Sequence, residues 1–382
     1  MYLPGYSHYQ KGYVLEQLHD KKVVVRRDVS FDESSRYKQP TDHSLQQEGD
    51  PLAIDDSIFE INLQYVSPPW PKTYREAVQL PEGKLWHEAA LREMQAHEEN
   101  ETWTLVSRPK DVRPIAGRWV FTKKRDQCGN ETYKARFVAK GYSQVYGIDY
   151  HETYTSVLQQ QSLRLLITIA VNNQWEIYQR DFKTAYLNAP LLTPIYIRQP
   201  EGFIEQGGED KVCLLNKALY GLKQAGRAWQ QELFTLISQN GYVQSKKEPC
   251  IWFKAYSKTM RLITIYVDGI LLTGNDEDEI KKISKIMGKE FKMKDLGKIQ
   301  EFLGIQVIRT NDGMKLCQRK YAEQVVKKFG QTNSKASPTP MTSVYENKNE
   351  NDNENIDNNY PIKQALGSLM YLSNSTRPDS FA

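Results

Sequence analysis

The chain has 382 residues, of which 39% are hydrophobic and 11% aromatic, so it is long enough for two or three domains with sizeable cores. Its net charge is only +4, from 51 basic and 47 acidic residues, and this overall balance gives no argument for a nucleic-acid partner. No apolar run approaches the ~20 residues needed to span a bilayer, and no basic region followed by an apolar one begins the chain. We therefore expect no membrane partner and no secretory signal.

Four cysteines, at positions 128, 213, 250 and 317, are spread widely, and none pair at metal-ligand or redox spacing. Sparse cysteine in a chain of this length favours a reducing, intracellular setting.

The N-terminal region predicts a small β unit over residues 1–34, with strands at Gly12–Leu15 and Lys22–Val25. Residues 35–75 are polar and contain proline, which is typical of a disordered linker. Folded structure is expected to resume near Tyr74. A second low-complexity stretch, Glu346–Asn359, carries five acids and one lysine and is predicted to be another linker.

Apolar residues at helical spacing predict several helices between the two linkers. They are expected at Leu85–Glu99, Ser162–Val171, within Lys217–Asn240, at Asp276–Lys289 with Asp276 as N-cap, and at Tyr321–Phe329. A C-terminal hairpin is expected from Phe302–Val307 and Met314–Cys317, around an Asn-Asp-Gly turn.

A second predicted hairpin, Arg118–Lys124 and Tyr133–Val138, concentrates positive charge that the net charge conceals. Seven cations fall within 23 residues: Arg118, Lys123, Lys124, Arg125, Lys134, Arg136 and Lys140. Such a cluster is often only a solvated face, but cations that flank a glycine turn also suit a flap that faces phosphates. Both interpretations stay open on the residues alone.

The stretch Arg261–Gly274, RLITIYVDGILLTG, joins two apolar runs through Asp268-Gly269. This pattern predicts a β-hairpin with a type I′ turn at that pair, which requires φ > 0 at both residues. Asp268 is then either an ordinary turn residue or a carboxylate presented at the hairpin tip.

Asp181 ends a second predicted strand, Trp175–Arg180, and lies 87 positions before Asp268. If the two strands are neighbours, the two carboxylates converge at one edge of a sheet. Paired carboxylates can hold two Mg²⁺ ions ~4 Å apart for phosphoryl or nucleotidyl transfer. On the residues by themselves the plain turn-former interpretation stays open and is the commoner one, since Asp at a strand end is mostly a turn residue.

Longer motifs, in a fixed order, are similar to the reverse transcriptase of Ty1/copia-type LTR retrotransposons over roughly residues 76–382. These motifs are TWTLV (102–106), RWVFTKK (118–124), YKARFVAKGYSQVYGIDYHETY (133–154), QRDFKTAYLNA (179–189), IYIRQPEGF (195–203), LNKALYGLKQAGRAW (215–229), YVDGILLTG (266–274), FKMKDLGKIQEFLGIQV (291–307) and LGSLMYLSNSTRPDSFA (366–382). Residues 1–34 resemble the end of the integrase region of the same Pol polyprotein.

The resemblance implies an α+β right-hand polymerase that follows an integrase remnant (1–34) and a linker (35–75). The reverse transcriptase would span 76–342, with fingers near 103–145, a ferredoxin-like palm near 146–309 and the start of a thumb at 310–342. A linker (343–359) and the start of a connection towards an RNase H (360–382) would follow.

The resemblance also implies roles for individual residues. Asp181 and Asp268 match catalytic carboxylates that bind two Mg²⁺ ions, together with the backbone carbonyl of Phe182. The remaining matches are to nucleotide-binding positions: Lys124 and Arg136 in the fingers, Tyr186 as the aromatic gate that excludes a 2′-OH, and Gln224. The implied partners are an RNA template, a DNA primer, dNTPs and other parts of the polyprotein. The implied location is a cytoplasmic particle with a nuclear phase.

The chain departs from the family pattern at four places. Gly269 replaces the second aspartate of the hairpin, and Thr155-Ser156-Val157 replaces Ser-Pro-Val. Gly226 stands where proline is usual, and Ala189 where glycine is usual.

Because of Gly269, we expect RNA-directed DNA polymerase activity that is severely reduced or absent. A catalytically inactive remnant that only binds nucleic acid is the alternative. An unrelated phosphohydrolase built on two aspartates is a third hypothesis, but it leaves the finger and gate matches unexplained.

Overall fold

The computed structural model describes residues 2–6, 13–16, 23–26, 70–125, 131–311, 313–334 and 361–378. The chain divides into two compact units, Met1–Asn62 and Leu63–Ala382. In the first unit, β1 (Tyr2–Tyr6), β2 (Tyr13–Glu16) and β3 (Val23–Arg26) form an antiparallel sheet in that order. The two predicted strands correspond to β2 and β3. Most of the predicted 35–75 linker and the whole 343–359 linker lie outside the described residues.

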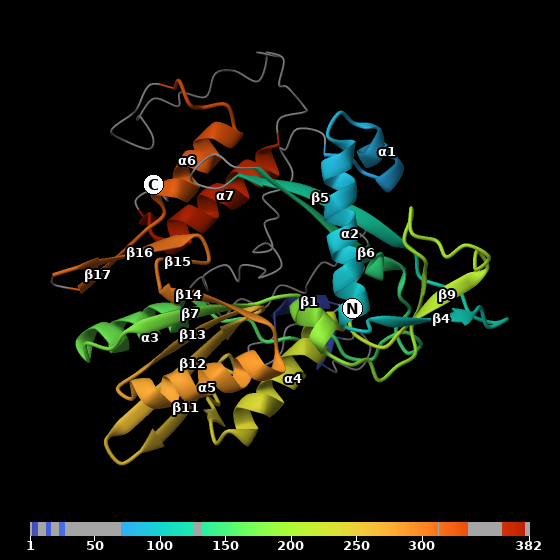
Figure 1. The fold of residues 1–382 in the computed structure, drawn as a ribbon. Coiled ribbons are helices and arrows are strands. Elements are labelled where there is room, and N and C mark those ends of the chain that lie inside the picture. The colour runs from blue at the N-terminus through green and yellow to red at the C-terminus, as the bar shows by residue number, and fades with distance from the viewer. Residues whose placement is uncertain are drawn as a thin grey trace. The chain divides into compact units, whose positions relative to one another are not determined.

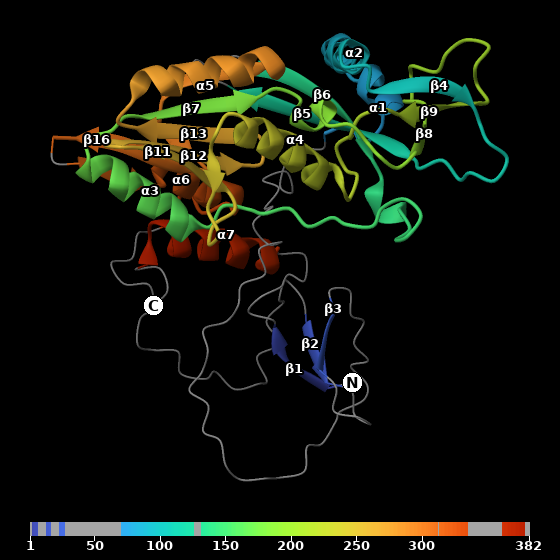
Figure 2. The same cartoon turned by 90° about the horizontal axis from the view of Figure 1, so that it is seen from below.

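The centre of the second unit is a six-stranded antiparallel sheet with the order β10-β11-β12-β13-β7-β14. Its strands are β7 (Ile177–Phe182), β10 (Val243–Gln244), β11 (Ile251–Tyr256), β12 (Thr259–Tyr266), β13 (Gly269–Gly274) and β14 (Met293–Lys298). Helices α4 (Ala225–Gln239) and α5 (Glu277–Glu290) cover one face, and α3 (Gln160–Asn172) covers the other. Figure 2 shows α5 and α3 on opposite sides of these strands.

The alternation of side chains between the two faces of the central strands explains this three-layer arrangement. Ile270 and Leu272 of β13 join the core under α4 and α5, whereas Leu271 joins the core under α3. Successive side chains of a strand point to opposite faces, so a continuous apolar run buries both faces of the sheet. The same alternation places Ile177, Gln179 and Asp181 of β7 on the α3 face.

Two more helices and two smaller sheets lie beside the central sheet, at the right of Figure 1. The elements are α1 (Tyr74–Gln79), α2 (Gly83–Glu99), the hairpin β5 (Gly117–Arg125) and β6 (Glu131–Ala139), and a sheet of β4 (Trp103–Ser107), β9 (Lys211–Leu215) and β8 (Tyr196–Arg198). Trp86 of α2 packs edge-on against Phe121 and Tyr133 of the hairpin. Along β6, Ala135, Phe137 and Ala139 are buried, so the intervening cations Lys134 and Arg136 face solvent.

The C-terminal part contains β15 (Glu301–Phe302), β16 (Ile305–Thr310), β17 (Gly313–Cys317), α6 (Arg319–Lys328) and α7 (Ile362–Ser375). The prediction of one strand over Phe302–Val307 is wrong, because a tight turn at Leu303-Gly304 separates β15 from β16. The predicted partner strand, Met314–Cys317, corresponds to β17, and Asp312 of its predicted turn lies outside the described residues. Among the described residues, no helix is long and apolar enough to cross a membrane.

The predicted type I′ turn at Asp268-Gly269 is also wrong. Tyr266 pairs with Gly269 and closes the β12–β13 hairpin, so the two central turn residues are Val267 and Asp268. Only Val267 has a positive φ, at +55°, which is an unfavourable conformation for a β-branched residue. The apolar pattern placed the hairpin correctly, but Asp-Gly pairs also occur where the glycine begins the next strand.

The strained turn is held from α4. The indole N–H of Trp229 donates to the carbonyl of Val267 at 2.8 Å, and its ring packs between Phe182 and Phe291, each with ring centres 5.0 Å away. Such local strain persists only where the surroundings determine the backbone.

We expect Trp229→Phe to lower the free energy of unfolding by about 1 kcal/mol more than Trp252→Phe. Both changes shorten a buried ring, but the indole N–H of Trp252 has no acceptor among the described residues. Urea denaturation of both variants measures the difference. Equal losses would show that the Trp229 hydrogen bond does not support the turn.

Candidate active site

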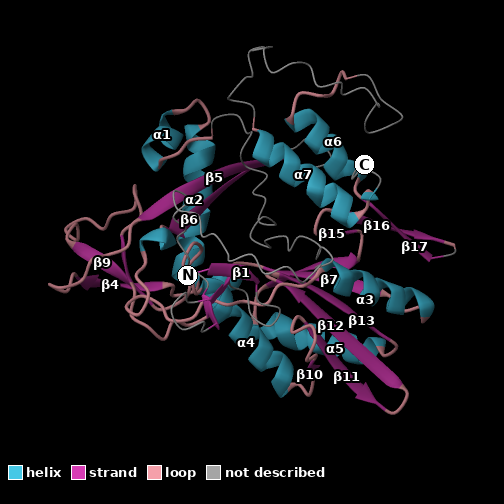
Figure 3. Ribbon diagram, turned by 180° about the vertical axis from the view of Figure 1, so that it is seen from behind, coloured by secondary structure: helices cyan, strands magenta, loops and turns pink. Residues whose placement is uncertain are grey.

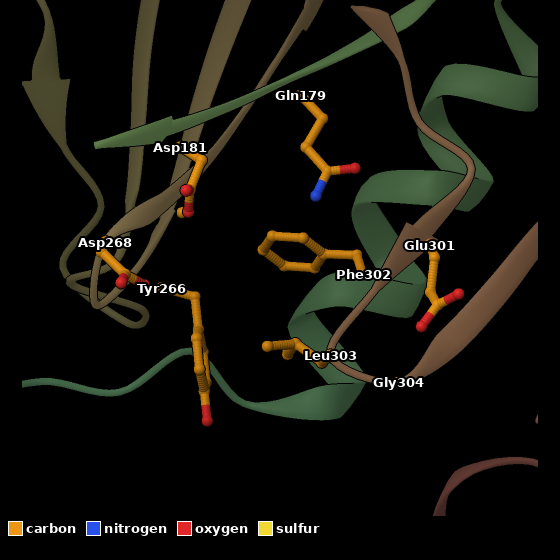
Figure 4. A pocket seen from close by; sticks show the side chains of 9 residues that line it. Gln179, Asp181, Tyr266, Asp268, Glu301, Phe302, Leu303 and Gly304 are labelled. Atoms are coloured by element: carbon orange, nitrogen blue, oxygen red, sulfur yellow. The ribbon is translucent and has the colours of Figure 1, made fainter. Parts of the chain in front are cut away.

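A pocket opens where β7, the tip of the β12–β13 hairpin and the β15–β16 turn meet (Figure 4). It is lined by Gln179, Asp181, Tyr266, Asp268, Gly269, Glu301, Phe302, Leu303 and Gly304. Figure 4 shows the side chains of Asp181 and Asp268 next to each other at one end of the pocket, with the Phe302 ring pointing in from the opposite wall.

The two predicted carboxylates converge because β13 pairs directly with β7. In this register Gly269 lies opposite Asp181, and the backbone N–H of Phe182 donates to the carbonyl of Asp268 at 2.8 Å. On the other side of β7, Lys294 of β14 lies opposite Asp181. Directly opposed residues of an antiparallel pair share a face with Cβ atoms about 5 Å apart. Asp181 therefore lies between an empty side-chain position and a cation that the sequence did not single out.

Gly269 leaves room for a larger side chain. Its φ is not in the left-handed region, so no backbone strain opposes a substitution. A Cβ built there would approach Phe302 Cε2 at 3.3 Å and the Tyr266 carbonyl at 3.6 Å. A small shift of the Phe302 ring would therefore admit a carboxylate beside Asp181.

The predicted nucleotide-binding residues Arg136 and Tyr186 meet through a third residue. The guanidinium of Arg136 lies 4.9 Å from the ring centre of Tyr220, and that ring lies 4.7 Å from the ring of Tyr186. Burial is the largest cause that raises the pKa of Tyr220 to about 12; nearby Arg136 lowers this pKa, and the charges of Asp268, Glu93 and Asp181 raise it. Tyr220 thus joins Arg136 to Tyr186, although the Leu-Tyr-Gly-Leu-Lys-Gln motif that contains it gave no role for it.

Tyr186 is held by local geometry. It lies in a short 3₁₀ helix, η3 (Ala185–Asn188), that begins after Thr184 at φ +49°. The side-chain amide of Asn188 donates to the carbonyls of Thr184 and Ala185 at 3.2 Å, which closes this turn. A tight turn therefore presents Tyr186 beside Tyr220.

Of the predicted site residues, only Asp181 and Asp268 line the pocket, and Gln224, Phe182 and Lys124 have other surroundings. Both ends of the Gln224 amide are engaged, by Gln144 at 3.0 Å and by the Asp149 carbonyl at 2.9 Å. Phe182 buries its ring on the opposite face of the sheet, in the core with Trp229. Lys124 pairs with Thr132 in the β5–β6 ladder, and its side chain lies outside the described residues. The roles of these three residues, like those of Arg136 and Tyr186, stay predictions.

The donor set suits a hard divalent cation. Asp181 and Asp268 offer carboxylate oxygens in a half-exposed pocket, and Mg²⁺ accepts few protein ligands when waters and phosphates complete its shell. Within the described parts of the chain, no group of three or more His, Cys, Asp or Glu side chains could hold a metal. The protein therefore provides two carboxylates, and the geometry leaves space for a third at position 269.

Two protein families match parts of this chain. Residues 100–343 match the family described as "Reverse transcriptase (RNA-dependent DNA polymerase)", and residues 1–45 match a "Retroviral polymerase SH3-like domain". The described elements from β4 to α6, including both carboxylates, fall within the first match.

The chain is also similar to curated transposon proteins. It is 36% identical over 318 residues to the "Retrovirus-related Pol polyprotein from transposon TNT 1-94" of Nicotiana tabacum, which covers 81% of this chain and 24% of that protein. It is 36% identical over 312 residues to the corresponding polyprotein from transposon RE1 of Arabidopsis thaliana, with 80% and 21% covered. The chain therefore spans about a quarter of the length of these relatives.

A solved structure, "Structure of the foamy viral protease-reverse transcriptase dRH in complex with ds DNA", matches with a TM-score of 0.34 and 12% identity over 67% of this chain and 38% of that one. This likeness is too low to carry an argument. The family match over more than half of the chain and the antiparallel sheet that brings Asp181 next to Asp268 are the stronger findings. The chain belongs to the reverse transcriptase (RNA-dependent DNA polymerase) family, and its relatives are Ty1/copia-type Pol polyproteins of plant and yeast transposons.

Proposed function

We propose that this chain is the polymerase module of a retrotransposon Pol polyprotein and adds dNTPs to a primer 3′-OH on an RNA template, with its chemical step impaired by Gly269. The observation that carries the proposal is the register of β13 on β7, which places Gly269 opposite Asp181 and next to Asp268. In this proposal the site is a polymerase centre with two carboxylates, in which position 269 lacks the third.

Each part of the site has a distinct task in this proposal. Asp181 and Asp268 would hold divalent cations, with the Phe182 carbonyl as a further ligand. Bound Mg²⁺ ions would lower the pKa of the primer hydroxyl and stabilise charge on the leaving phosphate. Arg136, exposed on the fingers hairpin, contacts the triphosphate through its planar guanidinium.

The remaining residues position the incoming nucleotide. Tyr186 lies under the sugar and excludes a 2′-OH, and Tyr220 supports it from the side that faces Arg136. The solvent-facing cations of β6 would contact phosphates, which makes binding of template and primer dependent on salt.

The alternative is a remnant that binds template and primer but does not extend them. The same Gly269 favours this candidate, because nucleic-acid binding spreads over many contacts while the chemical step depends on a few charges. Binding without extension would distinguish it from an impaired polymerase.

We expect Gly269→Asp to raise the rate of Mg²⁺-dependent primer extension about 10²–10³-fold, because one charged group is restored to an electrostatically organised site. Purified wild type, Gly269→Asp and Gly269→Asn are compared on the same template and primer. The Asn variant is the matched control, since it fills the same space without a charge.

Extension by the wild-type chain at the rate of the Asp variant would contradict the proposed impairment. Binding of template and primer by all three variants, with no extension by any, would favour the remnant.

In the Gly269→Asp background, we expect Arg136→Ala to raise the KM for dNTP about tenfold or more, because a charge-assisted contact to the triphosphate is lost. Lys134→Ala is the control, as it removes the same charge from the same face of β6 two residues earlier. Steady-state kinetics over a range of dNTP concentrations measures both. A similar rise in KM for both variants would show only a general effect of charge.

A further inference from the structure

The turn that closes one wall of the candidate site is strained. Phe302 pairs with Ile305, so Leu303 and Gly304 are the two central residues of the β15–β16 turn. Their φ angles are +52° and +68°. Two positive φ values are characteristic of a type I′ turn, which favours Asn or Gly and disfavours a branched side chain such as leucine at the first position. This backbone therefore needs support from outside the hairpin.

That support comes from the C-terminal helix α7, almost 70 residues later in the chain. The hydroxyl of Tyr371 donates to the carbonyl of Leu303. A Cβ built on Gly304 would lie 3.8 Å from the same hydroxyl, so the Tyr371 side chain lies against both turn residues. Burial raises the pKa of Tyr371 to about 12, so the phenol keeps its proton at neutral pH and remains a donor.

The helix that carries Tyr371 is itself fixed to α3. At its C-terminal end, the guanidinium of Arg164 on α3 donates to the carbonyls of Asn374 and Ser375. The amide of Gln160 donates to Ser375 Oγ at 2.9 Å. A cation at a helix C-terminus also interacts favourably with the helix dipole. Arg164 and Gln160 belong to the helix that covers the Asp181 face of the sheet.

The ring of Tyr371 is held from the other side by α6. Tyr321 meets it edge-on, with ring centres 5.1 Å apart and an interplanar angle of 83°. Figure 3 shows α7 lying alongside α6, close to β15. The helix thus joins three places: α3, α6 and the turn of the candidate site.

We propose that Tyr371 is a positioning residue: through its hydrogen bond to Leu303, α7 acts as a brace that keeps the strained 303–304 turn in place at the carboxylate pocket. Its effect on nucleotide transfer rests on the proposed function, whereas the brace itself does not. The polymerase site would then depend on a helix that lies beyond the 100–343 family match.

Hydrogen exchange of the full-length chain without ligand tests the brace directly. The reporter amides lie in residues 301–307, where the Val307 N–H donates to the Gln300 carbonyl at 2.8 Å. We expect Tyr371→Phe to speed exchange there about five- to tenfold, the effect of losing one hydrogen bond, while exchange within α3 stays unchanged. Tyr321→Phe is the matched control, because it removes a hydroxyl from the same helix pair but not from the turn. Equal exchange in the two variants would overturn the brace.

A second measurement asks whether the brace acts on the chemistry. In the Gly269→Asp background, Tyr371→Phe should lower kcat about tenfold with KM for dNTP unchanged, and Tyr321→Phe should do neither. Faster exchange at 301–307 with unchanged kcat would show that Tyr371 supports the turn without affecting nucleotide transfer. That result would overturn the functional part of the proposal. Failure of every variant to bind or extend a primer would contradict the proposed function and leave the exchange result standing.

Discussion

The pairing of β13 with β7 is the constraint on which the rest of the site depends. The pairing joins two strands that are far apart in the sequence, since Asp181 and Asp268 are separated by 87 positions. It also sets Gly269 opposite Asp181. Side chains opposed in this way share one face, so the register decides which residues enter the pocket. A one-residue slip would turn Asp181 towards the core under α4 and α5 and bring the ring of Phe182 into the pocket.

Several unfavourable backbone conformations surround the paired strands, and each has an identifiable support. Val267 at the hairpin tip is held by Trp229, and Leu303 at the opposite wall is held by Tyr371. Thr184, which precedes the turn of Tyr186, is held by the Asn188 amide. Strain of this kind persists where packing and hydrogen bonds determine the backbone, and it gathers around functional sites. The pocket is therefore built from short turns that more distant elements keep in place.

The departures from the family pattern have different structural meanings. A Cβ on Gly226 would lie 3.1 Å from Thr155 Oγ1, so two of the departures are neighbours, and the smaller residue at 226 accommodates the larger one at 155. Ala189 has an extended backbone at φ −94°, where glycine offers no advantage. Gly269 is different, because nothing in its surroundings requires glycine and the position faces the carboxylates. Only this departure changes the charge of the site.

The sequence by itself determined the α+β class, most of the helices, the hairpin around Asp268 and the family, because periodicity and long motifs are local signals. It placed φ > 0 at Asp268-Gly269, whereas the tertiary structure puts it at Val267, since turn position depends on the strand register that closes the hairpin. Tyr220 and Tyr371 gave no functional signal, because their roles arise only from contacts with residues distant in the chain. Composition and local spacing contain no information about such contacts. The contacts around the candidate site depend on tertiary structure, above all on the pairing of β7 with β13 and the packing of α7.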